Sequence, residues 1–217
     1  DEISPLLYGF TTDFYEALVT SKFRKELEDK YGKFLFDQAE CSLKTFSEEV
    51  IPQLQEENKL SSKYDKLIAS AKIPFDGEER TLSQMVPYTQ SKDRNIRKDA
   101  AKKVAEFFSA NKHEFDEIYD KLVKVRTEIA HKLGFKNYVE LAYARLRRLD
   151  YNAQDVAGYR KQVLENIVPL HSELRERQAK RLGIDKLKFY DEPINFNSGK
   201  ADPHGDPEWI LNHGKTM

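Results

Sequence analysis

Apolar residues recur at helical spacing along most of the chain. In the first third, the apolar residues Phe14, Leu18, Phe23 and Leu27 recur at steps of about three to five, and the stripe continues through Phe34, Phe36, Leu43, Phe46, Val50 and Leu54. This spacing predicts amphipathic helices that turn one face toward a core. Pro52 is expected to kink or end this segment, because proline lacks an amide donor. Ser61 is expected to cap a short further helix through Tyr64, Leu67 and Ile68.

The strongest apolar stripe follows residue 91. Its members are Val104, Phe107, Phe108, Phe115, Ile118, Tyr119, Leu122, Val125, Ile129 and Leu133. Steps of mostly three and four predict one long helix, and Gly134 is a natural residue just past its end. A second helix is expected over residues 138–149. A third is expected from about Asn152 to Leu182, interrupted by Pro169 and closed by Gly183.

The helical pattern breaks at residues 72–82. The pair Asp76-Gly77 lies between two short arms there, which predicts a small β-hairpin. An irregular loop between helices is the alternative, because Pro74 cannot donate a hydrogen bond to a ladder.

The pattern breaks again at residues 185–207, where Asp, Asn, Gly and Pro dominate. Leu187, Phe189 and Tyr190 form the apolar cluster of this segment, which is expected to be a loop with one short extended piece. Helix is expected to resume near Pro207.

Together these elements predict an all-α, multi-helix, bundle-like lobe with long antiparallel helices and a small β-hairpin near residues 72–82. Residues 1–217 are expected to form one helical unit, with a softer division into 1–90 and 91–217. Because the chain opens on Asp1 without Met and stops at Met217 where a helix is starting, we expect it to be a piece of a longer polypeptide.

Charge and cysteine content narrow the function classes. The 36 Lys and Arg residues nearly cancel 37 Asp and Glu residues, so neither nucleic acid nor an anionic membrane is an expected partner. No run of 18 apolar residues suits a spanning helix, and the first residues lack a secretion signal. With Cys41 alone, a disulfide within the chain and a Cys-rich zinc module are excluded. The expected location is the cytoplasm.

One histidine begins a segment that partly matches a zinc-peptidase helix. The HExxH motif needs histidines at i and i+4 and a glutamate that activates water. Residues 113–117 read His-Glu-Phe-Asp-Glu, so Glu117 stands where the second histidine is required. Phe115 and Ile118 lie on the core-facing stripe, which favours a plain surface stretch of an amphipathic helix.

A second histidine has the spacing of a carboxylate-bridged di-iron site. Glu128 and His131 lie at i and i+3, but such a site needs a second ExxH pair and two further glutamates. The favoured interpretation places His131 and Lys132 at a helix C-terminus, where cations are stabilised. A metal-binding bundle on Glu128 and His131 remains an alternative hypothesis.

The remaining chemistry-bearing residues lack partners in the sequence. His171, His204 and His213 suggest no nucleophile triad, and Cys41 is expected to be a small buried apolar residue. The basic run 145–148 could bind a phosphate or carboxylate, although a solvated or ion-paired helix face is favoured. The residues alone therefore assign no catalytic, cofactor-binding or metal-ligating position.

Several motifs, taken in order, resemble one peptidase family. They are Ser91-Lys-Asp-Arg94-Asn-Ile-Arg97-Lys-Asp-Ala100, Arg126-Thr-Glu-Ile-Ala-His-Lys-Leu-Gly134-Phe-Lys-Asn-Tyr138-Val-Glu-Leu-Ala142, Arg148-Leu-Asp-Tyr151 with Val156 and Tyr159-Arg160, Ile167-Val-Pro169-Leu, Leu182-Gly-Ile-Asp-Lys-Leu187, Tyr190-Asp191 and Asp202-Pro203. This order resembles the oligoendopeptidase F branch of the thimet-oligopeptidase-like zinc metallopeptidases. The resemblance runs from about residue 80 to the end, and the earlier helices are compatible with the family's N-terminal lobe.

The resemblance implies a zinc metalloendopeptidase that cleaves short peptides in a channel between helical lobes. The family's HExxH motif and its downstream glutamate ligand lie C-terminal to the region represented here. The resemblance therefore places zinc and the catalytic residues outside this chain, carries no family catalytic residue onto any position, and implies that the fragment alone is inactive. Its implied partners are short peptides and the missing C-terminal part. The alternative is a non-catalytic helical interaction or scaffold module.

Overall fold

The computed structural model describes residues 1–199 and 205–216. Its contacts divide the chain into two compact units: unit 1 comprises residues 1–71 and 108–163, and unit 2 comprises residues 72–107 and 164–217. Within the described residues the structure is mainly α-helical with one small antiparallel sheet, which confirms the predicted fold class. These boundaries differ from the expected softer division into residues 1–90 and 91–217. That residues 1–217 form one helical unit stays a prediction.

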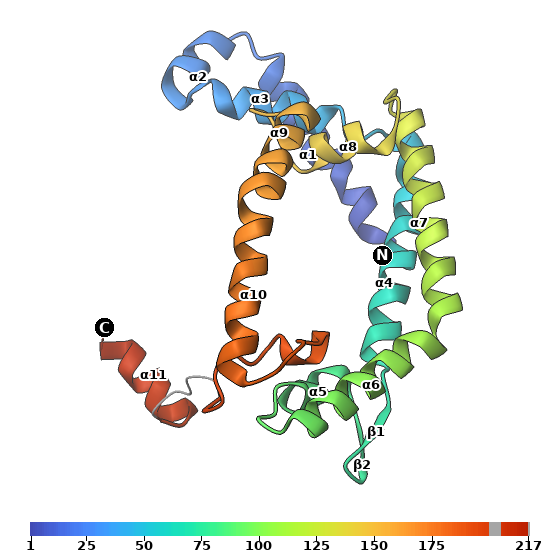
Figure 1. Ribbon diagram of the computed structural model, residues 1–217. Helices are drawn as coiled ribbons and strands as arrows, with labels where there is room; N and C mark the ends of the chain where they lie inside the picture. The colour runs from blue at the N-terminus through green and yellow to red at the C-terminus, as the bar shows by residue number, and fades with distance from the viewer. Residues whose placement is uncertain (200–204, 217) are drawn as a thin grey trace. The chain divides into compact units, whose positions relative to one another are not determined.

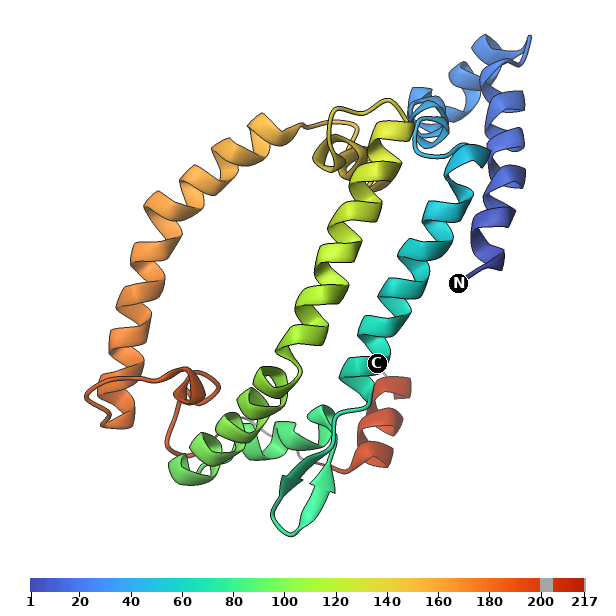
Figure 2. The same ribbon diagram turned by 90° about the vertical axis from the view of Figure 1, so that its right-hand side faces the viewer.

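Unit 1 is built from helices. Their bounds are α1 (Ile3–Val19), α2 (Arg24–Tyr31), α3 (Lys33–Leu43), the 3₁₀ turn η1 (Glu48–Val50), α4 (Ile51–Ala69), α7 (Lys112–Lys132), α8 (Tyr138–Arg145) and α9 (Ala153–Gln162). Helices α4 and α7 run side by side in opposite directions (Figures 1 and 2). Their facing sides form most of the core, which comprises Val50, Leu54, Leu60, Val125, Ile129, Ala130 and Leu141.

Unit 2 combines a hairpin with helices and a long loop. Its elements are β1 (Ile73–Phe75), β2 (Glu78–Arg80), α5 (Leu82–Thr89), α6 (Arg94–Ala110), the π-helical turn η2 (Val163–Ile167), α10 (Val168–Leu182), the 3₁₀ turn η3 (Phe189–Asp191) and α11 (Pro207–Thr216). The last residues of α6 and the first residue of η2 belong to unit 1. A small core joins the hairpin to α5 and α6 through Ile73, Met85 and Ala100.

The hairpin confirms the prediction for residues 72–82. Strands β1 and β2 pair antiparallel, with Phe75 opposite Glu78 across a two-residue turn. Asp76 and Gly77 both have positive φ, 54° and 77°. Two positive φ angles define the turn whose twist matches paired strands, which explains the Asp-Gly sequence.

Two expectations for the first third were wrong. Pro52 lies in the first turn of α4, where an amide donor would have no partner within the helix, so proline begins this helix instead of ending one. Ser61 lies inside the same helix and caps nothing, because α4 continues unbroken from Ile51 to Ala69. The apolar spacing does not show where one helix of the first third ends and the next begins, and the expected cap at Ser61 divides a helix, α4, that is continuous in the structure.

The predicted long helix is two helices, α6 and α7. They are separated at Asn111, whose backbone has φ −99° and ψ 11°. The apolar stripe hides this break, because Phe108 and Phe115 lie seven residues apart and keep the same helical phase. Gly134 follows α7 with φ 80° and donates its N–H to the His131 carbonyl, as expected for a residue past a helix end.

The helices after residue 134 lie where the sequence predicts them, apart from local differences in their bounds. Helix α8 ends at Arg145, short of the expected Leu149. The interruption before Pro169 is the π turn η2, and Gly183 closes α10 in the left-handed conformation. Residues 189–191 form a 3₁₀ turn that follows Lys188, whose backbone is extended, and the described part of residues 185–207 contains no β-strand.

The carboxylate of Asp191 accepts the Lys188 N–H and thereby stabilises that turn. Helix α11 begins at Pro207 as expected. Asp202, Pro203 and His204 lie outside the described residues. Among the helices of the described residues, none has both the length and the apolar character needed to cross a bilayer.

Candidate functional site

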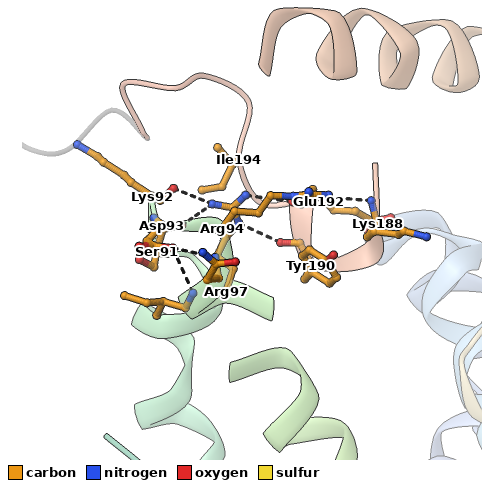
Figure 3. Close-up of polar contacts among 12 residues, drawn as sticks. Ser91, Lys92, Asp93, Arg94, Arg97, Lys188, Tyr190, Glu192 and Ile194 are labelled. Atoms are coloured by element: carbon orange, nitrogen blue, oxygen red, sulfur yellow. Dashed lines mark hydrogen bonds and ion pairs between the residues drawn. The ribbon is translucent and has the colours of Figure 1, made fainter. Parts of the chain in front are cut away.

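Unit 2 contains a buried carboxylate held by two arginines (Figure 3). Arg94 donates from Nε and Nη2 to the two carboxylate oxygens of Asp191, at 3.0 and 2.9 Å. Arg97 donates from Nη2 to Oδ1 of the same carboxylate at 3.1 Å. The Asp191 side chain is fully buried and that of Arg97 is 3% exposed. This arrangement ties helix α6 to the 3₁₀ turn η3.

The cluster is completed by backbone groups. Arg97 also donates to the carbonyls of Ser91, Lys92 and Tyr190, at 2.8 to 3.2 Å. Burial by itself would raise the pKa of Asp191, but hydrogen bonds from Arg94, Lys188 N–H and Arg97 outweigh it and lower the pKa to about 2. The carboxylate therefore stays charged, and the cluster holds helix α6 and the turn η3 together.

Two motifs quoted from the sequence meet in this cluster. The first is the segment 91–100, and the second is Tyr190-Asp191. Sequence reasoning did not pair them, because more than ninety residues separate Arg94 from Asp191 and no local spacing signals the contact.

Unit 1 contains a second carboxylate shared by two arginines. Arg126 of α7 donates from Nε to Oε1 of Glu57 at 2.7 Å, and Arg145 at the end of α8 donates from Nη1 to Oε2 at 3.0 Å. The Glu57 side chain is 12% exposed, whereas those of Arg126 and Arg145 are 33% and 21% exposed, so the cluster is partly removed from water. Helices α4, α7 and α8 are thereby joined.

A cavity of about 540 Å³ borders this cluster. Its walls come from α1, the end of α3 with the residues after it, α4, and the end of α8. Tyr8, Tyr15 and Asn58 contribute polar groups, and Arg145 and Arg147 contribute positive charge. A second cavity of about 550 Å³ lies between α4 and α7 and is lined more by aromatic and aliphatic side chains.

The sequence matches two parts of a peptidase family. Residues 1–46 match the Peptidase M3 N-terminal domain, and residues 87–201, more than half of the chain, match Peptidase family M3. The chain belongs to peptidase family M3.

Solved structures give the same assignment. A protein from Bacillus anthracis str. Ames, provisionally named oligoendopeptidase F, is 58% identical with a TM-score of 0.94. A second protein provisionally named oligoendopeptidase F is 54% identical with a TM-score of 0.96. PZ peptidase A, solved with an inhibitor, is 56% identical with a TM-score of 0.95.

Each of these comparisons covers the whole of this chain, and the family resemblance expected from the sequence is confirmed. The M3 chain spans only 38–40% of the length of these relatives. A search among curated proteins gave no match.

The HExxH-like segment of this M3 chain lies on the surface of α7. His113 is exposed, and the two glutamates beside it are ion-paired with lysines. Glu114 pairs with Lys63 at 3.2 Å, and Glu117 pairs with Lys121 at 2.6 Å, a hydrogen bond that lowers the pKa of Glu117. The interpretation as a plain surface stretch fits this placement.

The ExxH pair is also at the surface. Glu128 accepts a hydrogen bond from the Gln53 amide at 2.7 Å and pairs with Lys132 at 3.9 Å, and His131 is exposed. Within residues 1–199 and 205–216, no three His, Cys, Asp or Glu side chains gather in a group that could hold a metal ion.

Cys41 is buried as expected, whereas only the first residue of the basic run 145–148 lies on a helix, because α8 ends at Arg145. The Cys41 side chain is 9% exposed and its Sγ lies 3.4 Å from the Ala144 carbonyl oxygen, and burial raises the pKa of the thiol. Within the run, Arg145 is ion-paired with Glu57, and the guanidinium of Arg148 lies over the rings of Tyr143 and Tyr151. Among the described residues, Arg147 has neither an ion pair nor a contact of its guanidinium with an aromatic ring.

Proposed function

We propose that this chain is part of a zinc-dependent endopeptidase that hydrolyses short oligopeptides, and that it forms part of the wall of the substrate channel. The observation that carries this proposal is the 54–58% identity over the whole chain to oligoendopeptidase F and PZ peptidase A structures. Because the chain spans about two fifths of those proteins, hydrolysis is assigned to the longer polypeptide.

The residues described here do not fit a zinc site. Tetrahedral zinc sites need three or four His, Cys, Asp or Glu ligands together, and the described part of the chain has no such group. The sequence also contains no HExxH. We therefore expect the zinc ligands and the catalytic residues outside this chain and assign no catalytic or metal-ligating role within it.

Exposed apolar surface supports association with further polypeptide. On α1, Ile3, Phe10 and Phe14 are 61–73% exposed, and on α9 and η2 the side chains of Tyr159 and Leu164 are 70% and 65% exposed. Exposed apolar patches of this kind mark interaction surfaces. We propose that the catalytic remainder of the peptidase covers them, and that the protein acts in the cytoplasm.

The test compares the longer protein that contains this sequence with the 217-residue chain. Both are incubated with a quenched fluorescent oligopeptide, with and without a chelator, and their zinc content is measured. The longer protein is expected to cleave the peptide, to lose activity with chelator and to regain it with added zinc. The chain alone is expected to be inactive and free of stoichiometric zinc.

Three outcomes would contradict parts of this proposal. Chelator-sensitive cleavage by the chain alone would place the catalytic centre within it. Cleavage by the longer protein that survives chelation and zinc depletion would remove the zinc assignment. No cleavage of any peptide by a folded, zinc-loaded longer protein would favour the non-catalytic scaffold module.

A further inference from the structure

The cavity beside Glu57 carries more positive than negative charge. Arg145 and Arg147 line it, and among its lining residues in the described chain Glu57 is the one carboxylate. That carboxylate is already shared, because Arg126 also donates to it at 2.7 Å. A cavity of this size falls within the roughly 300–1,000 Å³ of small-molecule sites, and its uncompensated charge favours an anion.

Arg145 has donor capacity that the described chain does not use. Its Nη1 atom donates to both oxygens of Glu57, at 3.3 and 3.0 Å. Its Nη2 atom is buried and has no hydrogen-bond acceptor among the described residues. Because that atom is shielded from solvent, a ligand in the cavity does not reach it, and Arg145 contributes to the cavity its positive charge.

Arg147 occupies a position where glycine would be less strained. Its φ is 52°, its N–H donates to the Ala144 carbonyl at 2.9 Å, and the next N–H, of Arg148, donates to the Tyr143 carbonyl at 3.0 Å. The same pair of hydrogen bonds follows α7 and α10, where Gly134 and Gly183 stand at the corresponding position. A left-handed conformation is costly for a residue with a Cβ.

The strained arginine has no charged partner of its own. In the described part of the chain the Arg147 side chain makes no ion pair or hydrogen bond, although it lines the cavity together with Arg145. Side chains that are kept in strained backbone positions are concentrated at functional sites. Its guanidinium is therefore available to an anion in the cavity.

We propose that this cavity binds a carboxylate of a short peptide, that Arg147 is the residue that binds it, and that Arg145 adds positive charge to the cavity wall. Guanidinium groups bind carboxylates through paired hydrogen bonds. Tyr8, Tyr15 and Asn58 supply further polar groups of the kind that would meet a peptide backbone. The choice of a peptide as the source of the carboxylate rests on the proposed function.

The test measures peptide binding to the 217-residue chain by calorimetry at low salt. The probes are the N-acetylated tripeptide Ac-Ala-Ala-Ala with a free carboxylate, its C-terminal amide, and Ac-Ala-Glu-Ala amide, which carries the carboxylate on a side chain. Inorganic phosphate is a fourth probe. We expect at least one carboxylate peptide to bind at least tenfold more tightly than the Ac-Ala-Ala-Ala amide, and more tightly than phosphate.

The variants are chosen so that folding does not confound the result. Arg147→Gly removes the guanidinium and relieves the left-handed strain, so it is expected to keep or raise the melting temperature while weakening carboxylate binding at least tenfold. Arg148→Gln is the matched control, because it removes the same charge one residue away from a side chain that lies over Tyr143 and Tyr151. It is expected to change binding less than twofold.

The following outcomes overturn the proposal. Equal binding of the carboxylate peptides and the amide, tighter binding of phosphate, or an equal loss in Arg147→Gly and Arg148→Gln each exclude the assigned site. Because binding is measured without catalysis, failed binding beside intact hydrolysis by the longer protein overturns this inference alone. Specific binding beside absent hydrolysis overturns the proposed function alone.

Discussion

Replacing Asp191 with asparagine removes the charge at the centre of the unit 2 cluster while keeping the size of the side chain. Three donors from Arg94 and Arg97 then lose their anionic partner, and the Arg97 guanidinium is left in a position that is 3% exposed. An uncompensated buried charge is costly. Asp191→Asn should therefore destabilise unit 2 strongly at neutral pH.

The magnitude follows from the pKa of Asp191. A fall from the ordinary 3.8 to about 2 in the folded protein corresponds to about 2 kcal/mol of stabilisation at neutral pH. Because the folded pKa is the lower one, this contribution is complete above the ordinary pKa and is lost as the pH falls through the folded pKa. About half of this contribution should remain at pH 3, and only a small part of it at pH 2. With the stranded arginine included, we expect a cost of about 3 kcal/mol at pH 7.

The assay is urea unfolding at pH 7, 3 and 2, followed by circular dichroism, with hydrogen exchange to locate the loss. Amides of α6 and of residues 185–199 should exchange faster in Asp191→Asn. The matched control is Glu192→Gln, the neighbouring carboxylate, which pairs with Arg175 but is 59% exposed. Exposed pairs contribute little, so this control should lie within about 0.5 kcal/mol of the parent chain.

Two results would refute the reasoning. The first is a cost at pH 7 no larger than that of Glu192→Gln. The second is a cost that stays constant between pH 7 and pH 2, since a charge-based contribution must shrink by about 2 kcal/mol over that range.

Three further predictions concern other parts of the chain. Asn152→Ala removes the side-chain acceptor that caps α9 and should lower the free energy of unfolding, measured by thermal unfolding, by about 1 kcal/mol. Asn152→Asp keeps an acceptor at this position and should retain the stability of the parent chain. Glu57→Gln leaves Arg126 and Arg145 without their carboxylate and should cost about 3 kcal/mol, seen as faster hydrogen exchange in α4 and α7; a cost below 1 kcal/mol would contradict it. His113→Gln in the longer protein should leave zinc content and the rate of peptide hydrolysis within twofold of the unmutated protein. Loss of both would indicate that the HExxH-like segment binds the metal.

Features governed by neighbouring residues could be predicted from the sequence. The hairpin depends on Asp76-Gly77 accepting positive φ, and the ends after α7 and α10 depend on Gly134 and Gly183 doing the same. Helical spacing likewise identified most of unit 1. The exact helix boundaries were less accessible, because an apolar stripe continues across a break such as Asn111 without a change of phase.

The clusters could not be predicted, because they depend on contacts between distant segments. Glu57 meets Arg126 and Arg145 across 69 and 88 residues. In a chain with 34% charged residues, nearly any carboxylate has several arginines as possible partners, and only the packing of helices selects among them. The cavity lined by Arg147 could not be predicted for the same reason, although the basic run 145–148, which includes Arg147, was evident in the sequence.

The two arginine clusters carry the same charges but differ in how completely their hydrogen-bond donors are paired. Each places one carboxylate between two arginines, so each carries one excess positive charge. In unit 2 the Arg97 donors find Asp191 and three carbonyls, and nothing within the cluster calls for a ligand. In unit 1 the Nη2 atom of Arg145 finds no acceptor in the described chain, and the cluster borders a cavity. Both clusters join elements of the fold, and the cluster in unit 1 differs in bordering a cavity that is also lined by the exposed Arg147, where we propose that an anion binds.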